Sequence, residues 1–600
     1  MWKSIRFRRL FGPPPRRDRP TRRLSIEPLE ERCLPSVDPI LEWNEVLLQA
    51  NVVDHSGLRA PEQGGPVFTA RAFAIVSAAM FDAENSIHQR FTPYLTLAPN
   101  AHNASVDAAV AQAAHDTLAA LFPSQTASFD AALTQTLQRV HDGHQEERGI
   151  AVGHLVAQRI LSARADDGSD VPGSYTPTGL PGNHDVDPYH SDQGFYAPAA
   201  GAMTPFALPS VAQFRAPPPP ALTSSEYATA FDQVKRLGSD GVNTPTLRTA
   251  AETEIGLFWG YDGSPGLGVP PRLYNQIART VAGQQNNSVA ENARLFALLN
   301  LSLADAAIQC WDAKYTYDFW RPVLGIHNAD GDGNPLTQAD TSWHYLGAPA
   351  SNPMPGQTNF TPPFPSYTSG HATFGGASLK TLANFYQTDH LAFTFTSDEL
   401  NGATRDDHGN VRPLRPHTFA TFSQANAENG ASRVFLGIHW RFDQVQGARS
   451  GDAIANFVFD HFLQPLHGHG QTAIPDPDIA AQIDDYLAGG NGLPFGPAPA
   501  ALLARLAPPS ALRADAGVLQ GLTAADNSLV LTNLSADNAI PSGIPALTPA
   551  IDRVEVSAGV GKLIDAAASN IPITVKGQDS GSRDLVFSAR DFVDRLGELV

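Results

Sequence analysis

A long apolar stretch, residues 288–313, limits most strongly what this chain can fold into. Its apolar side chains fall on almost every side of the predicted helix: Ala293, Leu295, Phe296, Leu298, Leu299, Leu301, Leu303, Ala306 and Ile308. A helix that is apolar all round has to be buried on every side. Other elements of the chain must therefore surround this one.

Several other segments repeat apolar residues at helix-like intervals. Helices are predicted at 105–121, 126–142, 145–165, 224–240, 246–260 and 271–283, and the same spacing occurs at 41–53 and 67–81. Residues 168–222 instead contain Gly-Ser, Pro-Gly and a run of prolines, which predicts a long loop between two helical halves. The helical segments, with their repeated apolar residues, are typical of the walls of helical bundles.

The chain is predicted to have four regions. These are a basic, disordered leader at 1–37, a helical bundle with its crossover loop at 38–222, a second bundle at 223–470, and an extension of short helices and strands at 471–600. Strands within the extension are predicted at 528–532, 554–556, 571–575 and 584–588.

The leader contains ten Lys and Arg residues against four Asp and Glu in positions 1–36, and it has no apolar signal core. Residues 24–36 resemble a short motif that some bacteria place on exported or surface proteins. An exported or cell-surface location is therefore expected; a basic tail on a cytoplasmic protein is the alternative.

Composition excludes several classes of function. The chain has 600 residues, a net charge of -19, 42% hydrophobic and 17% charged residues, which argues for a globular protein without a nucleic-acid partner. Its two cysteines, Cys33 and Cys310, form no disulfide framework. No run of eighteen apolar residues occurs, so no transmembrane segment is predicted.

Residues 362–371, Pro-Pro-Phe-Pro-Ser-Tyr-Thr-Ser-Gly-His, predict a stiff loop that leads into a helix. The first N–H groups of a helix and its dipole attract anions. The N–H groups of Ser369 and Gly370 can therefore hold an oxygen of a bound oxyanion. An ordinary helix cap is the alternative.

Two further stretches carry cations and an imidazole. Lys314 and Arg321 are seven residues apart in an aromatic-rich segment, so a continuing helix would place both on one face. In the second stretch Arg433 precedes His439 by six residues, and Asp443 follows four later, where it can accept the second ring N–H of His439. Buried like charges are costly unless an anion neutralises them. Surface cations and a core histidine are the alternatives.

Together the three stretches resemble the signature shared by vanadium-dependent haloperoxidases and the type 2 phosphatidic acid phosphatases. Segments 258–264, 270–277, 292–298, 346–350, 397–402 and 435–443 are further similar to the fungal-type chloroperoxidases. The resemblance implies an all-α fold of two four-helix bundles, here with a small irregular or β-containing C-terminal extension.

The resemblance also implies a site that holds vanadate. The cofactor-binding residues would be Lys314, Arg321, Ser369, Gly370, Arg433 and His439. His439 would ligate the vanadium, His371 would be the acid–base residue, and Lys314 would polarise the bound peroxide. The same resemblance places Asp262 against an arginine and Asp443 behind His439, and it places Trp311 and Phe364 on the halide side, where core packing is the alternative.

The expected function is a peroxidase that uses hydrogen peroxide and vanadate to oxidise chloride, bromide or both to hypohalous acid. Two alternatives stay open at this point. One is an acid phosphatase with a phosphohistidine intermediate, because a site for a tetrahedral oxyanion suits phosphate and vanadate alike. The other is an exported surface protein with a relict site. The sequence leaves the organic acceptor and the oligomeric state open.

Overall fold

The computed structural model describes residues 38–467 and 470–490, together with five short strands between residues 523 and 588. The chain divides into two compact units, residues 1–494 and 495–600. The predicted leader at 1–37 lies outside the described residues, so its disorder and the exported location stay predictions. The predicted boundary at residue 222 between two helical halves likewise stays a prediction.

The first half of the large unit is a group of helices, of which the second is mostly buried. They are α1 (Pro39–Asp54), α2 (Gly65–His88), α3 (Val106–Leu121), α4 (Thr126–Leu137) and α5 (His144–Ala163). Glycine lets two of them approach closely, because a Cβ on Gly153 of α5 would lie 2.8 Å from the amide nitrogen of Ala113 on α3. As predicted, residues 168–222 contain no α-helix.

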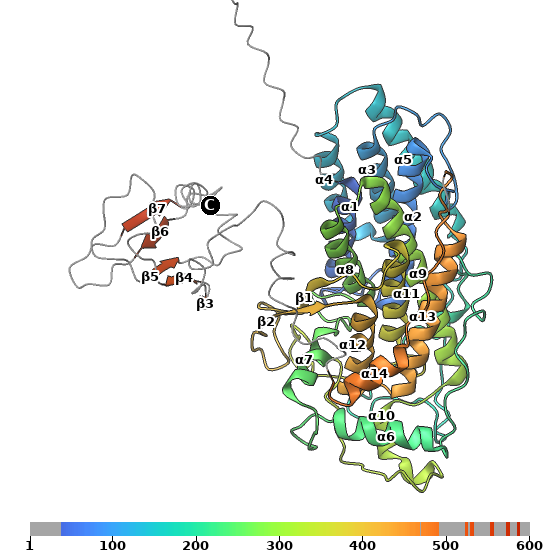
Figure 1. Ribbon diagram of the computed structural model, residues 1–600, viewed down its shortest axis with the longest axis vertical. Helices are drawn as coiled ribbons and strands as arrows, with labels where there is room; N and C mark the ends of the chain where they lie inside the picture. Colours follow the sequence, from blue (N-terminus) through green and yellow to red (C-terminus); the bar gives the residue numbers. More distant parts are fainter. Residues whose placement is uncertain are drawn as a thin grey trace, which may run out of the picture. The chain divides into compact units, whose positions relative to one another are not determined.

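The second half of the large unit contains the remaining helices. They are α6 (Ser225–Leu237), α7 (Ala250–Phe258), α8 (Pro270–Gln285), α9 (Val289–Tyr317), α10 (Pro322–His327), α11 (Gly370–Phe385), α12 (Phe422–Phe435), α13 (Arg441–His461) and α14 (Ile479–Leu487). Helices α2, α9, α11 and α13 run lengthwise beside one another (Figure 1). The backbones of α11 and α13 touch, since a Cβ on Gly451 would lie 2.6 Å from the amide nitrogen of Ala377.

A β-hairpin interrupts the helices of the large unit. Its strands β1 (Phe393–Asn401) and β2 (Leu414–Phe419) pair antiparallel, with Phe393 opposite Phe419. The small unit contains β3 (Thr523–Ala525), β4 (Ser528–Thr532), β5 (Arg553–Val556), β6 (Pro572–Val575) and β7 (Leu585–Ser588). These form antiparallel sheets in the orders β3-β4-β5 and β6-β7, so the strands predicted in the extension are confirmed.

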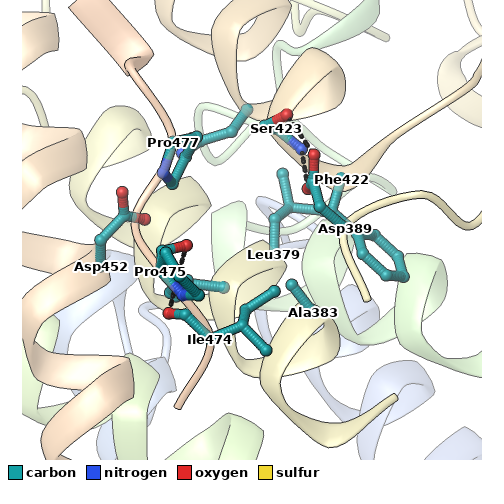
Figure 2. Close-up of a pocket in the computed structure, with 11 residues that line it drawn as sticks. Leu379, Ala383, Asp389, Phe422, Ser423, Asp452, Ile474, Pro475 and Pro477 are labelled. Atoms are coloured by element: carbon teal, nitrogen blue, oxygen red, sulfur yellow. Dashed lines mark hydrogen bonds between the residues drawn. The ribbon is translucent and has the colours of Figure 1, made fainter. Parts of the chain in front are cut away.

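A small cavity of about 120 Å³ lies between α11, α12, α13 and the segment that precedes α14 (Figure 2). Leu379, Phe422 and Pro477 contribute apolar walls, and the carboxyl group of Asp452 adjoins the cavity. Asp452 itself is only 3% exposed. An acidic side chain is therefore buried here beside a mostly apolar space.

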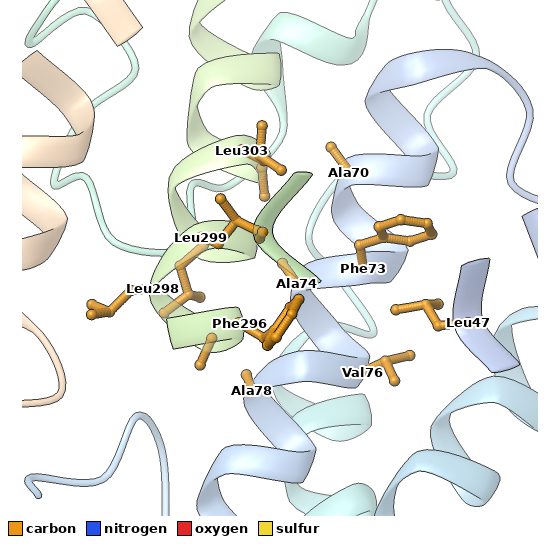
Figure 3. Packing of buried hydrophobic residues seen from close by; sticks show 14 of the residues in the cluster. Leu47, Ala70, Phe73, Ala74, Val76, Ala78, Phe296, Leu298, Leu299 and Leu303 are labelled. Carbon is orange, nitrogen blue, oxygen red and sulfur yellow. The ribbon is translucent and has the colours of Figure 1, made fainter. Parts of the chain in front are cut away.

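Helix α9 is the buried centre that the apolar stretch predicts. Phe296, Leu299 and Leu303 of α9 face the side of α2 that carries Ala70, Ala74 and Ala78 (Figure 3). By length and composition α2 and α9 could each cross a membrane, but 83% and 100% of their apolar windows are buried in the protein. Packing against other helices accounts for this hydropathy, and the predicted all-helical architecture is confirmed.

Candidate active site

The loop 362–369 ends where Ser369 caps α11, with its Oγ accepting the N–H of Ala372 at 3.4 Å. Helix α11 then begins at Gly370, so its positive end faces the site. The N–H of Ser369, one of the two predicted oxyanion donors, instead donates to the carbonyl oxygen of Asp443 at 3.1 Å. The loop is thus tied to α13, and the candidate donors here are the Gly370 N–H and the Ser369 hydroxyl.

Lys314 is fully buried in the last turn of α9. Its ammonium group donates to the carbonyl oxygens of Pro365 at 2.8 Å, Ser366 at 3.0 Å and Thr368. Burial lowers the pKa of Lys314, and the nearby Arg321 lowers it further. In this structure Lys314 therefore stabilises the loop 362–369 through these hydrogen bonds. Its contact with an oxyanion stays a prediction.

Arg321 reaches the same place by a route other than the predicted helix face. Helix α9 ends at Tyr317, and Asp318 reverses the chain with a left-handed φ of 50°. The Arg321 guanidinium then donates from Nε to the carbonyl oxygen of Phe364 at 3.0 Å and from Nη1 to that of Ile438 at 2.8 Å. Its Nη2 is buried without a hydrogen-bond partner.

Arg433, in the last turn of α12, faces the loop between α7 and α8. Its Nη2 donates to both carboxylate oxygens of Asp262, at 2.7 and 2.9 Å, while its Nε is buried without a partner. An unpaired buried donor costs about 1–3 kcal/mol, more for a charged group. Unpaired donors on Arg433 and Arg321 therefore indicate a place built for an anion.

His439 lies between α12 and α13, where Gly437 turns the chain with a φ of 74°. Its Nδ1 is 2.8 Å from Oδ2 of Asp443, an oxygen that also accepts from the Ser366 hydroxyl and the Trp440 N–H. Since Asp443 accepts from these donors, Nδ1 carries the hydrogen, and the lone pair of Nε2 accepts from Nη1 of Arg321 at 3.0 Å. Burial and this arginine hold the pKa of His439 well below its usual value.

A neutral imidazole with its lone pair on Nε2 is the form that ligates metals. The donor set of this structure, one such nitrogen with unpaired guanidinium N–H groups beside it, therefore fits vanadate. The same set also fits phosphate.

His371, in the first turn of α11, faces the loop that carries Asp262. Its Nε2 is 2.6 Å from the carbonyl oxygen of Gly260, and its Nδ1 is 4.0 Å from Oδ1 of Asp262. A carbonyl only accepts, so Nε2 carries the hydrogen and Nδ1 is the basic nitrogen. Burial lowers the pKa of His371 to about 4, and Arg433 adds to this effect. The ring is therefore a neutral base at ordinary pH.

A cavity of about 160 Å³ reaches His371, Arg433 and His439. Its other wall is apolar, with Trp311 and Phe364 in contact at a ring-centroid distance of 4.9 Å. The indole N–H of Trp311 is buried without a partner. The structure thus brings the predicted aromatic residues to the same cavity as the predicted histidines.

Two sequence comparisons place this chain among known proteins. The family model described as the VCPO second helical-bundle domain matches residues 294–468. The chain is 32% identical over 496 residues to the vanadium chloroperoxidase of Curvularia inaequalis, covering 67% of this chain and 78% of that protein.

Solved structures show the same fold. A bacterial vanadium-dependent iodoperoxidase superposes with a TM-score of 0.56 at 22% identity, covering 72% of this chain and 97% of that one. A holo-type bacterial vanadium-dependent chloroperoxidase gives a TM-score of 0.53 at 16% identity, covering 69% and 96%.

Three residues at the site were not predicted from the sequence. Gly260 contributes only its carbonyl oxygen, Ser366 donates to Asp443, and Tyr196 lines the cavity in ring contact with Trp311. Ser366 and Gly260 lie within segments that carry the family resemblance, and their position there was the available signal. Tyr196 comes from the crossover loop, whose sequence gives no such signal.

Proposed function

The chain belongs to the vanadium chloroperoxidase family, whose cofactor is vanadate, and on that premise we propose that it oxidises chloride and bromide with hydrogen peroxide. Haloperoxidase activity in general follows from membership of the family. The choice of halide and the roles of individual residues are the proposal. The observation that supports it most is the Nε2 lone pair of His439 beside unpaired guanidinium N–H groups of Arg321 and Arg433.

His439, Arg321, Arg433, Gly370, Ser369 and Lys314 would hold the vanadate. When bound, vanadate supplies a Lewis acid that activates hydrogen peroxide toward halide. Asp443 fixes the tautomer of His439 through Nδ1, so that the lone pair stays on Nε2. Asp262 holds the guanidinium of Arg433 in place with two hydrogen bonds.

His371 would act as the base for hydrogen peroxide. Its Nδ1 accepts the proton, because Nε2 is already held as a donor by the carbonyl oxygen of Gly260. The lowered pKa keeps the ring neutral and ready to accept above about pH 4. In this role His371 is the residue that moves a proton, whereas His439 is held unprotonated as a ligand.

Trp311 and Phe364 would form the halide side. Beside an apolar wall a halide ion is partly desolvated, which makes oxidation of the poorly reactive chloride feasible. The unpaired indole N–H of Trp311 is a donor available to a halide ion. The proposed preference, chloride as well as bromide, depends on this wall.

An acid phosphatase and a relict site are the alternatives. The relatives described above are haloperoxidases, which favours peroxide chemistry over both.

The test assays halide oxidation and phosphoester hydrolysis on one preparation, with and without added vanadate, alongside His439→Ala. We expect vanadate-dependent oxidation of chloride and bromide that phosphate suppresses and that His439→Ala abolishes. Hydrolysis that vanadate inhibits would instead indicate the phosphatase, and a folded protein silent in both assays would indicate a relict site. Oxidation of bromide or iodide without chloride would refute the proposed halide range.

A further inference from the structure

The loop between α7 and α8 supplies the acceptors that orient two of the proposed active-site side chains. Gly260 accepts from Nε2 of His371, and Asp262 accepts from Arg433. The carbonyl oxygen of Trp259 receives a longer bond from Nη1 of Arg433, at 3.4 Å. Because residues 259–264 have no regular secondary structure, contacts from elsewhere have to fix the course of this loop.

Strand β1 fixes it through three consecutive residues. The Ser397 hydroxyl donates to the carbonyl oxygen of Phe258 at 2.6 Å, and the Asp398 N–H donates to the phenolic oxygen of Tyr261 at 2.7 Å. Between these two points, Oε1 of Glu399 accepts the N–H of Tyr261 at 3.0 Å. Strand β1 therefore forms hydrogen bonds with the loop on both sides of Gly260.

Glu399 is the charged member of this contact and is fully buried. Its other carboxylate oxygen, Oε2, accepts from the Ser351 hydroxyl and forms an ion pair with Arg412, which is itself 6% exposed. Such a carboxylate is anchored by donors on three sides. Removing a charged partner from a buried pair is strongly destabilising to its surroundings.

The loop conforms closely to Glu399. Tyr261 adopts a φ of 60°, a left-handed conformation that non-glycine residues seldom take unless their surroundings hold them. A Cβ at Gly260 would overlap Oε1 of Glu399 and lie 2.8 Å from Cγ of Pro349. The backbone at 260–261 is therefore shaped against this carboxylate.

We propose that Glu399 is a positioning residue that acts through Tyr261 and Gly260 on His371. The inference rests on the proposed function in so far as His371 is the base for peroxide. The carbonyl of Gly260 keeps the His371 hydrogen on Nε2 and the lone pair on Nδ1, so displacement of that carbonyl frees the ring to turn or to change tautomer. Displacement of the loop also moves Asp262 away from Arg433.

The test compares full-length Glu399→Ala and Glu399→Gln with the parent protein. The matched control is Thr394→Ala on the same strand, which removes an exposed cross-strand contact with Thr418 and no contact with the loop. Three quantities are measured: kcat and KM for hydrogen peroxide, the Kd of vanadate for the cofactor-free chain, and the side-chain ¹⁵N signals of His371, assigned with His371→Gln.

Glu399→Ala should lower kcat 10- to 100-fold with little change in KM, weaken vanadate binding, and shift the His371 nitrogen signals. Glu399→Gln should lose less, because its amide oxygen can still accept from the N–H of Tyr261. Thr394→Ala should match the parent in all three quantities. A purely structural role would lower the unfolding temperature without moving the His371 signals.

A folded Glu399→Ala protein with a kcat within threefold of the parent and unchanged His371 signals would overturn the inference. If Glu399→Ala does not fold, Glu399→Asp replaces it, since the shorter side chain keeps the charge near Arg412 but withdraws the acceptor from the N–H of Tyr261. Parent-like kcat and signals in folded Glu399→Asp would then overturn the inference. The NMR measurement does not depend on halide oxidation. If the parent protein oxidises no halide, the proposed function is refuted. Shifted His371 signals in Glu399→Ala would still support the positioning role of Glu399.

Discussion

Replacing Asp452 by asparagine should make the stability of the large unit less sensitive to pH. Asp452 is 3% exposed beside the cavity in Figure 2, and burial raises the pKa of its carboxyl group from 3.8 to about 8. The carboxylates of Asp476 and Asp389 raise this pKa further, and Lys380 opposes them. Lys380 already binds Asp476 at 3.0 Å and two carbonyl oxygens, which limits its help to Asp452.

The size of the effect follows from the two pKa values. Between about pH 4 and 8 the folded chain keeps a proton on Asp452 that the unfolded chain releases, so the free energy of unfolding falls by up to about 1.4 kcal/mol per pH unit as pH rises. Asparagine has the same shape and does not titrate. From pH 5 to pH 7 the variant should therefore gain roughly 2–3 kcal/mol relative to the parent.

Equilibrium unfolding in guanidinium chloride at pH 5, 6, 7 and 8, monitored by tryptophan fluorescence, measures this difference. Other groups titrate equally in both proteins and cancel. Asp232→Asn, on the exposed side of α6, is the control and should run parallel to the parent. If Asp452→Asn also runs parallel to the parent across this range, the buried carboxyl is not held protonated and the reasoning is wrong.

Two further predictions concern the site. We expect kcat/KM for hydrogen peroxide to fall tenfold per pH unit below about pH 4, because protonated His371 no longer accepts a proton. His371→Ala should lower kcat/KM roughly 10²–10⁴-fold and abolish this acid limb; persistence of the limb would assign it to another group. Asp262→Asn should weaken vanadate binding by about 10- to 100-fold, measured by ⁵¹V NMR titration, since an amide donor then faces the guanidinium of Arg433. Asp484→Asn, which faces Arg441 in a similar pair, is the control, and equal affinity in the two variants would contradict the role given to Asp262.

The buried helix was the most predictable part of the fold. Its expected range, 288–313, begins one residue before the observed α9, Val289–Tyr317, and ends four residues short of it, because a helix that is apolar all round is stable only where it is buried on every side. The hairpin β1–β2 was missed, although Phe393 and Phe395 alternate with threonines in the period of a strand. The alternating segment is short and lies between predicted helices, so its pattern was not recognised as a strand.

The site was predictable where its chemistry lies in side chains. The two arginines, the lysine and both histidines were named from residue type and resemblance, and the structure brings all of them around the 362–371 loop. The helical spacing used for Lys314 and Arg321 was wrong, since the helix ends between them and they meet through carbonyl oxygens of the loop. A carbonyl acceptor such as that of Gly260 is present in every residue type, so no sequence pattern distinguishes it.

The backbone contact between α11 and α13 has a consequence for how the enzyme can diversify. Both helices begin at the site, α11 with His371 and α13 with Asp443, and behind these ends Gly376 and Gly451 leave no space even for a methyl group. Substitutions at the contact between α11 and α13 would displace His371, the proposed base, together with Asp443, which orients His439. New substrate preferences are therefore expected to arise from exchanges along the aromatic wall of the cavity, where a side chain can change without shifting the scaffold.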